Sequence, residues 1–269
     1  MRLGILGSIL AIAVGIAYWA VVQHHRQTQW LRAYDEASDS FERMHYADAE
    51  GQLRMILGNA KGPNERQAAL TMNLLALVYH AEGRRKEAEA PFEKAIQIFA
   101  QEGPSSRMDV AKACNNEGRM YLEENRLQEA DQRLQQSLAI FQEEPAAAGA
   151  ELGSALQNLG LVRRGQKRDA EGQSLLEQAV QVYERNLPPN DLDLAQGYLD
   201  LADEYRFEGL LKNAREIDQK ALAIQESAFG SDSPVTRETR ARINLESNAV
   251  PTKSSQKLIG AAVQAGQNR

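Results

Sequence analysis

The stretch NNEGRMYLEENRLQEA, residues Asn115–Ala130, contains a pattern that recurs along the chain. In it, Gly118 lies twelve positions before Ala130, and Tyr121 lies between them. Steps of 42 residues lead to three other segments in which both outer slots again hold small residues: Ala76, Tyr79 and Ala88; Gly160, Arg163 and Gly172; Ala202, Tyr205 and Ala214. Because each copy of a fixed-period repeat forms one structural unit, this pattern decides the fold class.

Other columns of residues follow the same period. One column holds small residues, and these are Ala69, Ala111, Gly153 and Ala195. A second column, near the end of each copy, holds Ala95, Ser137, Ala179 and Ala221. An earlier copy contains Ala37 and Ala49, again twelve apart, and lies 39 residues before the next copy. We therefore count five copies.

Each copy is predicted to form two helices. Apolar side chains fall at helical spacing, as in Leu74, Val78 and Tyr79. The break AEGRR at residues 81–85 is too short for anything but an antiparallel turn. Small residues such as Gly118 let the paired helices approach closely, so a phenylalanine there should destabilise the pair by overpacking. Stacked pairs would bury a continuous core and form a solenoid with a concave surface.

Two segments show this pattern best: NLLALVYHAEGRRKEAEAPFEKAIQIF at Asn73–Phe99 and DVAKACNNEGRMYLEENRLQEADQRLQQSLAIF at Asp109–Phe141. They resemble the tetratricopeptide repeat (TPR), in the 42-residue form found in kinesin light chains and many bacterial proteins. The resemblance covers residues 28–248. It implies an all-α, right-handed superhelical solenoid of about five helix-turn-helix repeats, with a capping helix at about 236–247.

Three residues depart from the family pattern. Arg163 stands in the tyrosine column, and Asp218 stands where an aromatic residue is expected. We expect both changes to make the fourth and fifth repeats less securely packed. Asn244 replaces a small residue in the final helix, which we interpret as the cap over the last apolar edge.

Residues 3–22 form a run of twenty residues without a charge. A helix of this length spans about 30 Å, the hydrocarbon thickness of a bilayer. We therefore predict a transmembrane anchor within residues 1–24, with Trp19 and Trp30 near the interface. The competing interpretation is a secretory signal peptide that is cleaved after Gly15-Ile16-Ala17.

The orientation of a single-pass anchor depends on its flanking charges, here Arg2 on one side and Arg26 and Arg32 on the other. We expect a cytoplasmic N-terminus, with the solenoid on the periplasmic or extracytoplasmic side of the membrane.

Charge also bears on the partners. All acidic residues lie between Asp35 and Glu246, and their excess in this region makes nucleic acid an unsuitable partner. Residues 249–269 form a separate tail with no acid and a net charge of +3, which we expect to be mobile. Alternatively, four tail residues at helix-like spacing form a short helix that docks on the end of the solenoid or on a partner: Leu258, Ile259, Ala262 and Val263.

The sequence offers no constellation for catalysis. No nucleophile and base pair stands out, and the four histidines show no metal-ligand spacing with the single cysteine. Cys114 falls on the packing face of its helix and is expected to be a buried, inert thiol. No glycine-rich phosphate-binding motif occurs. We therefore expect no enzyme activity, no cofactor and no metal site.

In TPR proteins the first helix of each pair lines the concave groove, and the resemblance assigns the peptide-binding residues by register. Two slots present mainly amides, and these are Asn73, Asn115 and Gln157, then Asn116, Asn158 and Asp200. Further slots are basic and hold His80, Lys112, Arg119, Arg164 and Arg206.

This basic character predicts a partner peptide that is acidic or bears a carboxylate. The alternative is that the amides only bridge neighbouring helices and the arginines pair with Glu123, Asp203 or Glu204.

The function expected from these features is that of a membrane-tethered scaffold that binds partner polypeptides in the groove while residues 3–22 sit in the bilayer. Two alternatives remain open: a secreted or periplasmic soluble module, and a self-assembling structural membrane protein.

Overall fold

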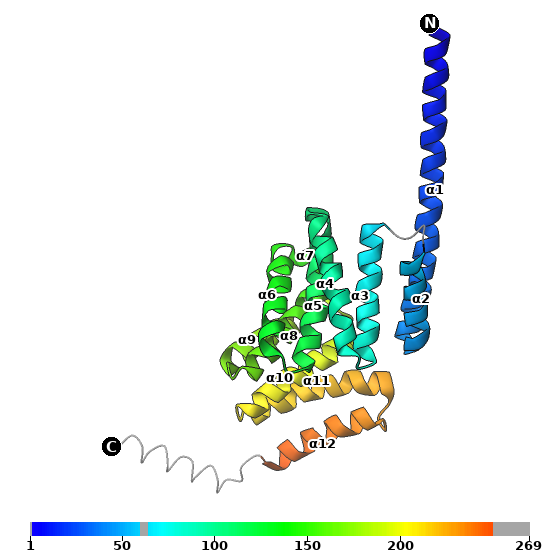
Figure 1. Ribbon diagram of the computed structural model, residues 1–269. Coiled ribbons are helices and arrows are strands. Elements are labelled where there is room, and N and C mark those ends of the chain that lie inside the picture. Colours follow the sequence, from blue (N-terminus) through cyan, green and yellow to red (C-terminus); the bar gives the residue numbers. More distant parts are fainter. Residues whose placement is uncertain (1, 60–63, 250–269) are drawn as a thin grey trace. The chain divides into compact units, whose positions relative to one another are not determined.

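The computed structural model describes residues 2–59 and 64–249 of the chain, and the side chains within 18–59 and 64–244. The described residues form twelve α-helices and one 3-10 helix, which confirms the all-α class (Figure 1). The chain divides into two compact units. The first contains residues 1–124 and 132–140, and the second contains residues 125–131 and 141–269.

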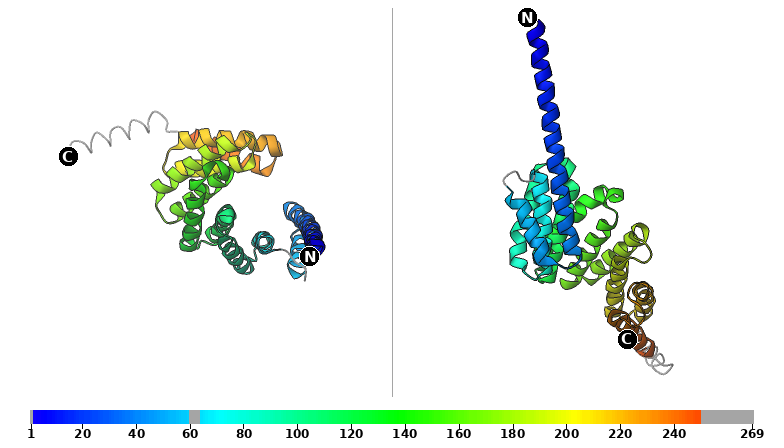
Figure 2. Two further views of the ribbon diagram at one scale, coloured as in Figure 1. Left: turned by 90° about the horizontal axis from the view of Figure 1, so that it is seen from above. Right: turned by 90° about the vertical axis from the view of Figure 1, so that its right-hand side faces the viewer.

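The first unit consists of helical hairpins stacked side by side (Figure 2). Its α1 packs against α2, and its α3 packs against α4. The elements are α1 (Arg2–Glu42), α2 (Tyr46–Gly58), α3 (Glu65–Ala81), α4 (Arg85–Gln101), the 3-10 helix η1 (Pro104–Ser106), α5 (Arg107–Glu123) and part of α6 (Leu127–Glu143).

The second unit continues the same architecture, with α8 packed against α9 and α10 against α11. A final helix, α12, packs on α11 as the predicted cap. The elements that follow α6 are α7 (Pro145–Ala148), α8 (Ala150–Gly165), α9 (Asp169–Asn186), α10 (Leu192–Phe207), α11 (Leu211–Phe229) and α12 (Pro234–Ala249).

Close approach at the small slots explains why they recur. A Cβ atom added to Gly118 would lie 2.7 Å from Cγ of Leu134, in the partner helix. One added to Gly160 would lie 3.1 Å from the carbonyl oxygen of Gly172. Contacts this short leave no room for a large side chain, so the small residues set the spacing within each hairpin.

Each hairpin turn is closed by one residue in the left-handed backbone conformation. The five residues, with their φ angles, are Met44 (60°), Gly83 (74°), Asn125 (58°), Lys167 (62°) and Gly209 (78°). The next residue donates its N–H back to the last turn of the preceding helix, as from Leu210 to the Tyr205 carbonyl at 2.7 Å. This arrangement satisfies carbonyls that the helix end would otherwise leave unpaired.

Two of the three departures from the family pattern, Arg163 and Asp218, are compensated by ion pairs. The Arg163 side chain is 7% exposed and lies 2.6 Å from Asp131. Asp218 is fully buried, and its carboxylate lies 2.6 Å from Arg206. Charged partners therefore occupy places where other copies hold a ring or an aliphatic side chain, because a buried charge needs a partner.

The predicted anchor falls on α1, which is one continuous helix from Arg2 to Glu42 and extends beyond the hairpins of its unit (Figure 1). The side chains of residues 3–17 lie outside the described ones, so the anchor stays a prediction. Among the residues that the structure describes, no helix has both the length and the apolar character needed to cross a bilayer.

Trp30, predicted to lie near the membrane interface, packs within the first unit. Trp30 is half-buried, and its indole N–H donates to the Thr71 hydroxyl of α3 at 3.2 Å. Its ring centroid lies 5.1 Å from that of Tyr34. Trp30 therefore belongs to the packing of the first unit, whereas Tyr18 and Trp19 are 72% and 63% exposed on the free part of α1.

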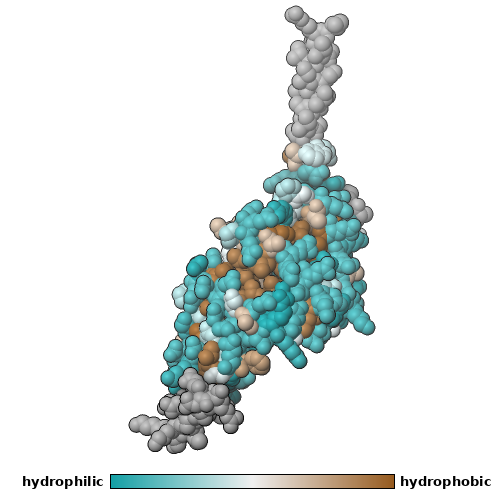
Figure 3. All heavy atoms as spheres, turned by 90° about the vertical axis from the view of Figure 1, so that its left-hand side faces the viewer, coloured by the Kyte–Doolittle hydropathy of each residue, from teal (hydrophilic) through white to brown (hydrophobic). Residues whose placement is uncertain are grey.

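The surface in Figure 3 is mostly hydrophilic, with hydrophobic side chains gathered in patches between charged ones. This mixture is ordinary for a folded protein, since polar groups cannot cover the whole surface. Two large apolar residues, Phe207 and Leu210, are exposed at the turn between α10 and α11.

Candidate functional site

The predicted groove residues lie on the first helices of the hairpins, in two sets. Six belong to the first unit, on α3 and α5: Asn73, His80, Lys112, Asn115, Asn116 and Arg119. Five belong to the second unit, on α8 and α10: Gln157, Asn158, Arg164, Asp200 and Arg206.

In the first unit, basic side chains surround a single carboxylate. His80 Nε2 lies 3.2 Å from Glu123, and the Arg85 guanidinium lies 3.7 Å from the same group. Burial lowers the pKa of His80; the charges of Arg119 and Arg85 lower it further, whereas Glu123 opposes them. Arg119 is exposed on α5. Because its lowered pKa favours neutral His80, the positive charges of the cluster are those of Arg85 and Arg119.

The sequence did not single out Arg85, because it lies at the start of α4 and not on a first helix of a hairpin. Its role could be found only from the fold, which brings the start of α4 near the end of α5. The other candidates of this unit differ in exposure. Lys112 is exposed, Asn73 and Asn116 are half-buried, and Asn115 is only 7% exposed.

In the second unit the amide column is used within the protein. Gln157 accepts a hydrogen bond from the Tyr183 hydroxyl at 2.7 Å and donates one to Asp200 at 2.5 Å. Gln196 also donates to Asp200, at 2.9 Å. Burial raises the pKa of Asp200, although both amide hydrogen bonds favour its ionised form. Gln157 thus bridges neighbouring helices, which was the alternative interpretation of the amides, and Asn158 is similarly buried.

The two arginines of this set both meet carboxylates. Arg164 lies 3.9 Å from Glu204, and its side chain is 36% exposed whereas that of Glu204 is fully buried. Arg206 pairs with Asp203 and with the buried Asp218. Arg164 and Glu204, like Arg206 and Asp218, are far apart in the sequence. The sequence alone therefore could not show whether these arginines bind a partner or pair within the protein.

A further arginine contacts the same two aspartates as Arg206. Arg242 of the cap helix α12 pairs with Asp203 and lies 3.7 Å from Asp218. The two arginines and two aspartates link α10, α11 and α12 in one network. This network holds the cap on the last repeat.

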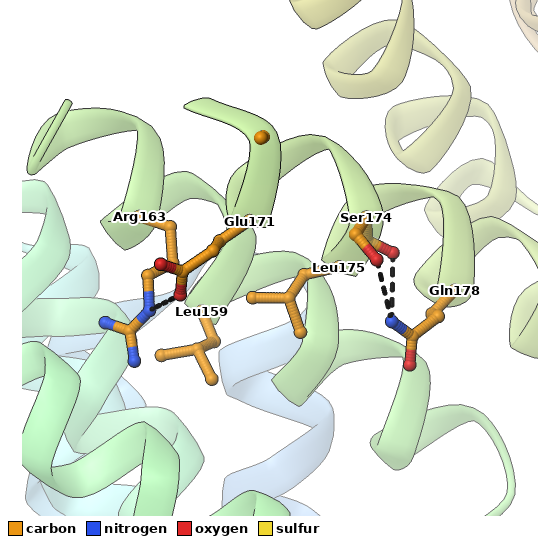
Figure 4. A pocket seen from close by; sticks show the side chains of 7 residues that line it. Leu159, Arg163, Glu171, Ser174, Leu175 and Gln178 are labelled. Atoms are coloured by element: carbon orange, nitrogen blue, oxygen red, sulfur yellow. Dashed lines mark hydrogen bonds and ion pairs between the residues drawn. The ribbon is translucent and has the colours of Figure 1, made fainter. Parts of the chain in front are cut away.

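An open hollow on the second unit lies between α8 and α9 (Figure 4). Leu159 and Leu175 form its floor. Arg163 is paired with Glu171 across 3.5 Å, and Gln178 donates to the Ser174 carbonyl at 3.1 Å. Since the polar groups are engaged with one another, the hollow presents no convergent set of groups for a ligand.

Two observations bear on chemistry. Within the part of the chain that the structure describes, no three histidine, cysteine or carboxylate side chains gather as a metal site would require. Cys114 is buried, as predicted, and burial raises the pKa of its thiol to about 12. A thiol held protonated in this way is a poor nucleophile.

Comparisons with known proteins agree with the architecture. The family model described as "Tetratricopeptide repeat" matches residues 67–143 and 151–227, more than half of the chain. No curated protein matches the chain.

Solved structures with the same fold include a putative kinesin light chain with nearly identical TPR-like repeats from Podospora anserina. It is 20% identical, with a TM-score of 0.58, over 75% of this chain and 97% of that one. Pseudomonas aeruginosa pilF is 20% identical, with a TM-score of 0.55, over 88% and 99% of the two chains.

A third similar structure is aspartyl phosphate phosphatase F from Bacillus subtilis. It is 14% identical, with a TM-score of 0.62, over 86% of this chain and 58% of that one. At these identities the likeness concerns the fold alone.

Proposed function

The chain belongs to the tetratricopeptide-repeat family, whose members are protein–protein interaction modules, and from this premise we propose that it is a membrane-tethered scaffold for acidic polypeptide segments. The observation that supports the partner chemistry is the cluster around Glu123. There, His80 and Arg85 lie 3.2 Å and 3.7 Å from one carboxylate, and Arg119 adds a positive charge that acts on His80. An acidic side chain or a carboxylate from a partner would balance the remaining charge.

Exposure separates the residues that can take part. Arg119 and Lys112 lie seven positions apart on α5 and are both exposed, so they can contact a bound peptide without rearrangement of the core. Asn73 and Asn116 are half-buried beside them. In the second unit Arg164 is the partly exposed cation, and it would act with its neighbour Glu204 rather than as an isolated charge.

Binding to a labelled acidic peptide tests this proposal. With the purified full chain, Arg119→Ala should weaken binding of a glutamate-rich peptide about five- to tenfold, because a partly exposed ion pair contributes about 1 kcal/mol. Binding should also weaken as salt rises, since screening acts on exposed charges.

The matched control is Lys94→Ala, which removes an exposed cation from α4, a second helix of its hairpin. It should leave both peptide affinity and thermal stability unchanged. Equal loss in the two variants, or equal affinity for a glutamine-rich peptide, would show that the Glu123 cluster does not select the partner.

The membrane tether forms the other part of the proposal. It is supported by the uncharged run at residues 3–22, by the continuity of α1 and by the exposure of Tyr18 and Trp19. Aromatic residues at the end of an apolar helix suit the membrane interface. Tethering raises the local concentration of the scaffold, so modest affinities are sufficient.

Two measurements test the tether. The protein should remain in the membrane fraction after carbonate extraction, and mass spectrometry should find the N-terminal residues in place. A mature chain starting near Tyr18 would instead establish a soluble module released by signal cleavage. Light scattering in detergent would detect the self-assembling alternative.

A further inference from the structure

Three of the five hairpin turns share a polar clasp, which is missing from the α10–α11 turn. In three turns, the arginine after the left-handed residue donates Nε to the glutamate three positions later. The distances are 2.9 Å for Arg84–Glu87, 3.0 Å for Arg126–Glu129 and 2.9 Å for Arg168–Glu171. The corresponding residues of the α10–α11 turn are Leu210 and Asn213.

This turn is apolar and open. Phe207 is 70% exposed and Leu210 is 42% exposed. The earlier turns have Ala81, Glu123 and Gly165 at the position of Phe207. Two adjacent large apolar side chains left in water at one turn cost free energy that a covering segment would recover.

Carboxylates surround this apolar spot. Glu204 lies one helical turn before Phe207, and Glu208 follows it directly and is exposed. Both oxygens of Glu204 are buried without a hydrogen-bond partner among the described residues, and Arg164 is 3.9 Å away. Burial raises the pKa of Glu204, and the charges of Asp169 and Glu208 raise it further. Arg206, which precedes Phe207, is paired with Asp203 and Asp218, so Glu208 is the exposed charge directly beside Phe207.

The course of α12 leads to the same spot. α11 and α12 run antiparallel and pack together, and Arg242 of α12 lies 3.7 Å from Asp218 of α11 (Figure 1). Seven residues further along α12 is Ala249, and seven residues back along α11 is Leu211. Both steps cover about 10 Å, so α12 ends at the level of the apolar turn.

We propose that residues 253–263 of this chain dock on the apolar turn formed by Phe207 and Leu210. This segment has the complementary chemistry, with Leu258, Ile259 and Val263 to cover the apolar side chains and Lys253 and Lys257 to face the carboxylates. The seven residues from Pro251 to Lys257 reach about 20 Å when extended, more than the turn requires. A tethered segment also needs only weak intrinsic affinity.

The labelling rate of an introduced thiol tests this docking in the full chain. Leu210→Cys places a thiol in the covered turn, and Arg168→Cys places one at the same position of the α8–α9 turn as the matched control. Cys114 is buried and does not compete for a maleimide reagent. Adding Leu258→Ser and Ile259→Ser should speed labelling of Leu210→Cys about tenfold, as expected when a mostly covered state is lost. Labelling of Arg168→Cys should not change.

Charge reversal makes the test specific to the segment. Lys257→Glu should also speed labelling at position 210, and the further change Glu208→Lys should restore the slow rate. If the labelling rate at position 210 stays the same with every substitution in residues 253–263, the proposal is overturned, because the turn is then open or covered by another protein. A rate that falls with protein concentration would overturn it in favour of a second copy of the chain.

Discussion

Gly118 shows how a single residue sets the distance between two helices. The absent side chain leaves room for Leu134 of the partner helix, whose Cγ lies 2.7 Å from where a Cβ would be. Alanine or glycine is therefore required at these positions for the helices to pack. This requirement is why the hairpins could be predicted from the sequence.

The change Gly118→Ala tests this close approach. We expect it to lower the free energy of unfolding by about 1–3 kcal/mol, because Leu134 must leave its preferred position. In a background that already carries Leu134→Ala, the same change should cost little or should stabilise, since alanine favours the helix. Chemical denaturation followed by circular dichroism measures the four stabilities; additive changes would contradict the contact.

His80 gives a prediction about pH. Burial lowers its pKa, so the unfolded chain binds the proton more readily than the folded one. Stability contributed by neutral His80 is present above the unfolded pKa of about 6.5 and is lost as the pH falls below it. As the pH falls from 7 to 5, the free energy of unfolding of the unaltered protein should therefore decrease relative to that of the His80→Gln variant. A difference that stays constant over this range would contradict the assignment.

At the scale of elements, the hairpin turn recurs with the same backbone geometry whether or not the sequence supplies glycine. Gly83 and Gly209 suit the left-handed conformation, whereas Met44 and Lys167 adopt it against their preference. The fold imposes this conformation because the chain must reverse within a few residues between helices of fixed spacing.

Two glycines allow the effect of backbone strain on stability to be measured without an effect of packing. A Cβ on Gly83 or on Gly51 meets nothing within 4 Å, yet only Gly83 has a positive φ, of 74°. Gly83→Ala should therefore destabilise by about 1 kcal/mol, whereas Gly51→Ala, inside α2, should stabilise by up to about 1 kcal/mol. Thermal melting of the two variants checks the sign; equal effects would show that the turn tolerates alanine.

The sequence predicted the hairpins and the final helix because these depend on spacing alone. It did not predict η1 and α7, which lie in linkers where the repeat pattern stops. Nor did it predict the burial of Gln157, since register shows which face an amide lies on but not whether Tyr183 and Asp200 reach it. The partners of Arg163 and Asp218 were equally hidden, because charged pairs between helices leave no periodic signal.

At the scale of the whole molecule, the repeats contact mainly their neighbours in the chain, so their stability should be largely local. The network of Arg206, Asp218 and Arg242 belongs to the second unit only. The right-handed superhelix that the family resemblance implies stays a prediction.

Disrupting that network should loosen one unit and leave the other unchanged. Asp218→Leu restores the kind of residue found in the column of Phe92, Leu134 and Leu176, but removes a buried charge that faces two arginines. We expect it to destabilise α10–α12 by about 3 kcal/mol, and the added change Arg206→Leu to recover part of the loss. Hydrogen exchange should become faster in α10–α12 and stay the same in α3–α5. Equal acceleration in both regions would contradict local stability.

The unbroken course of α1 has a mechanical consequence. The helix that begins at Arg2 continues without a break to Trp30, whose indole is hydrogen-bonded to Thr71 of α3. No hinge therefore separates the N-terminal part of α1 from the first hairpin. A force applied to the N-terminal part of α1 is therefore transmitted along one helix to the surfaces where α1 packs on α2 and α3.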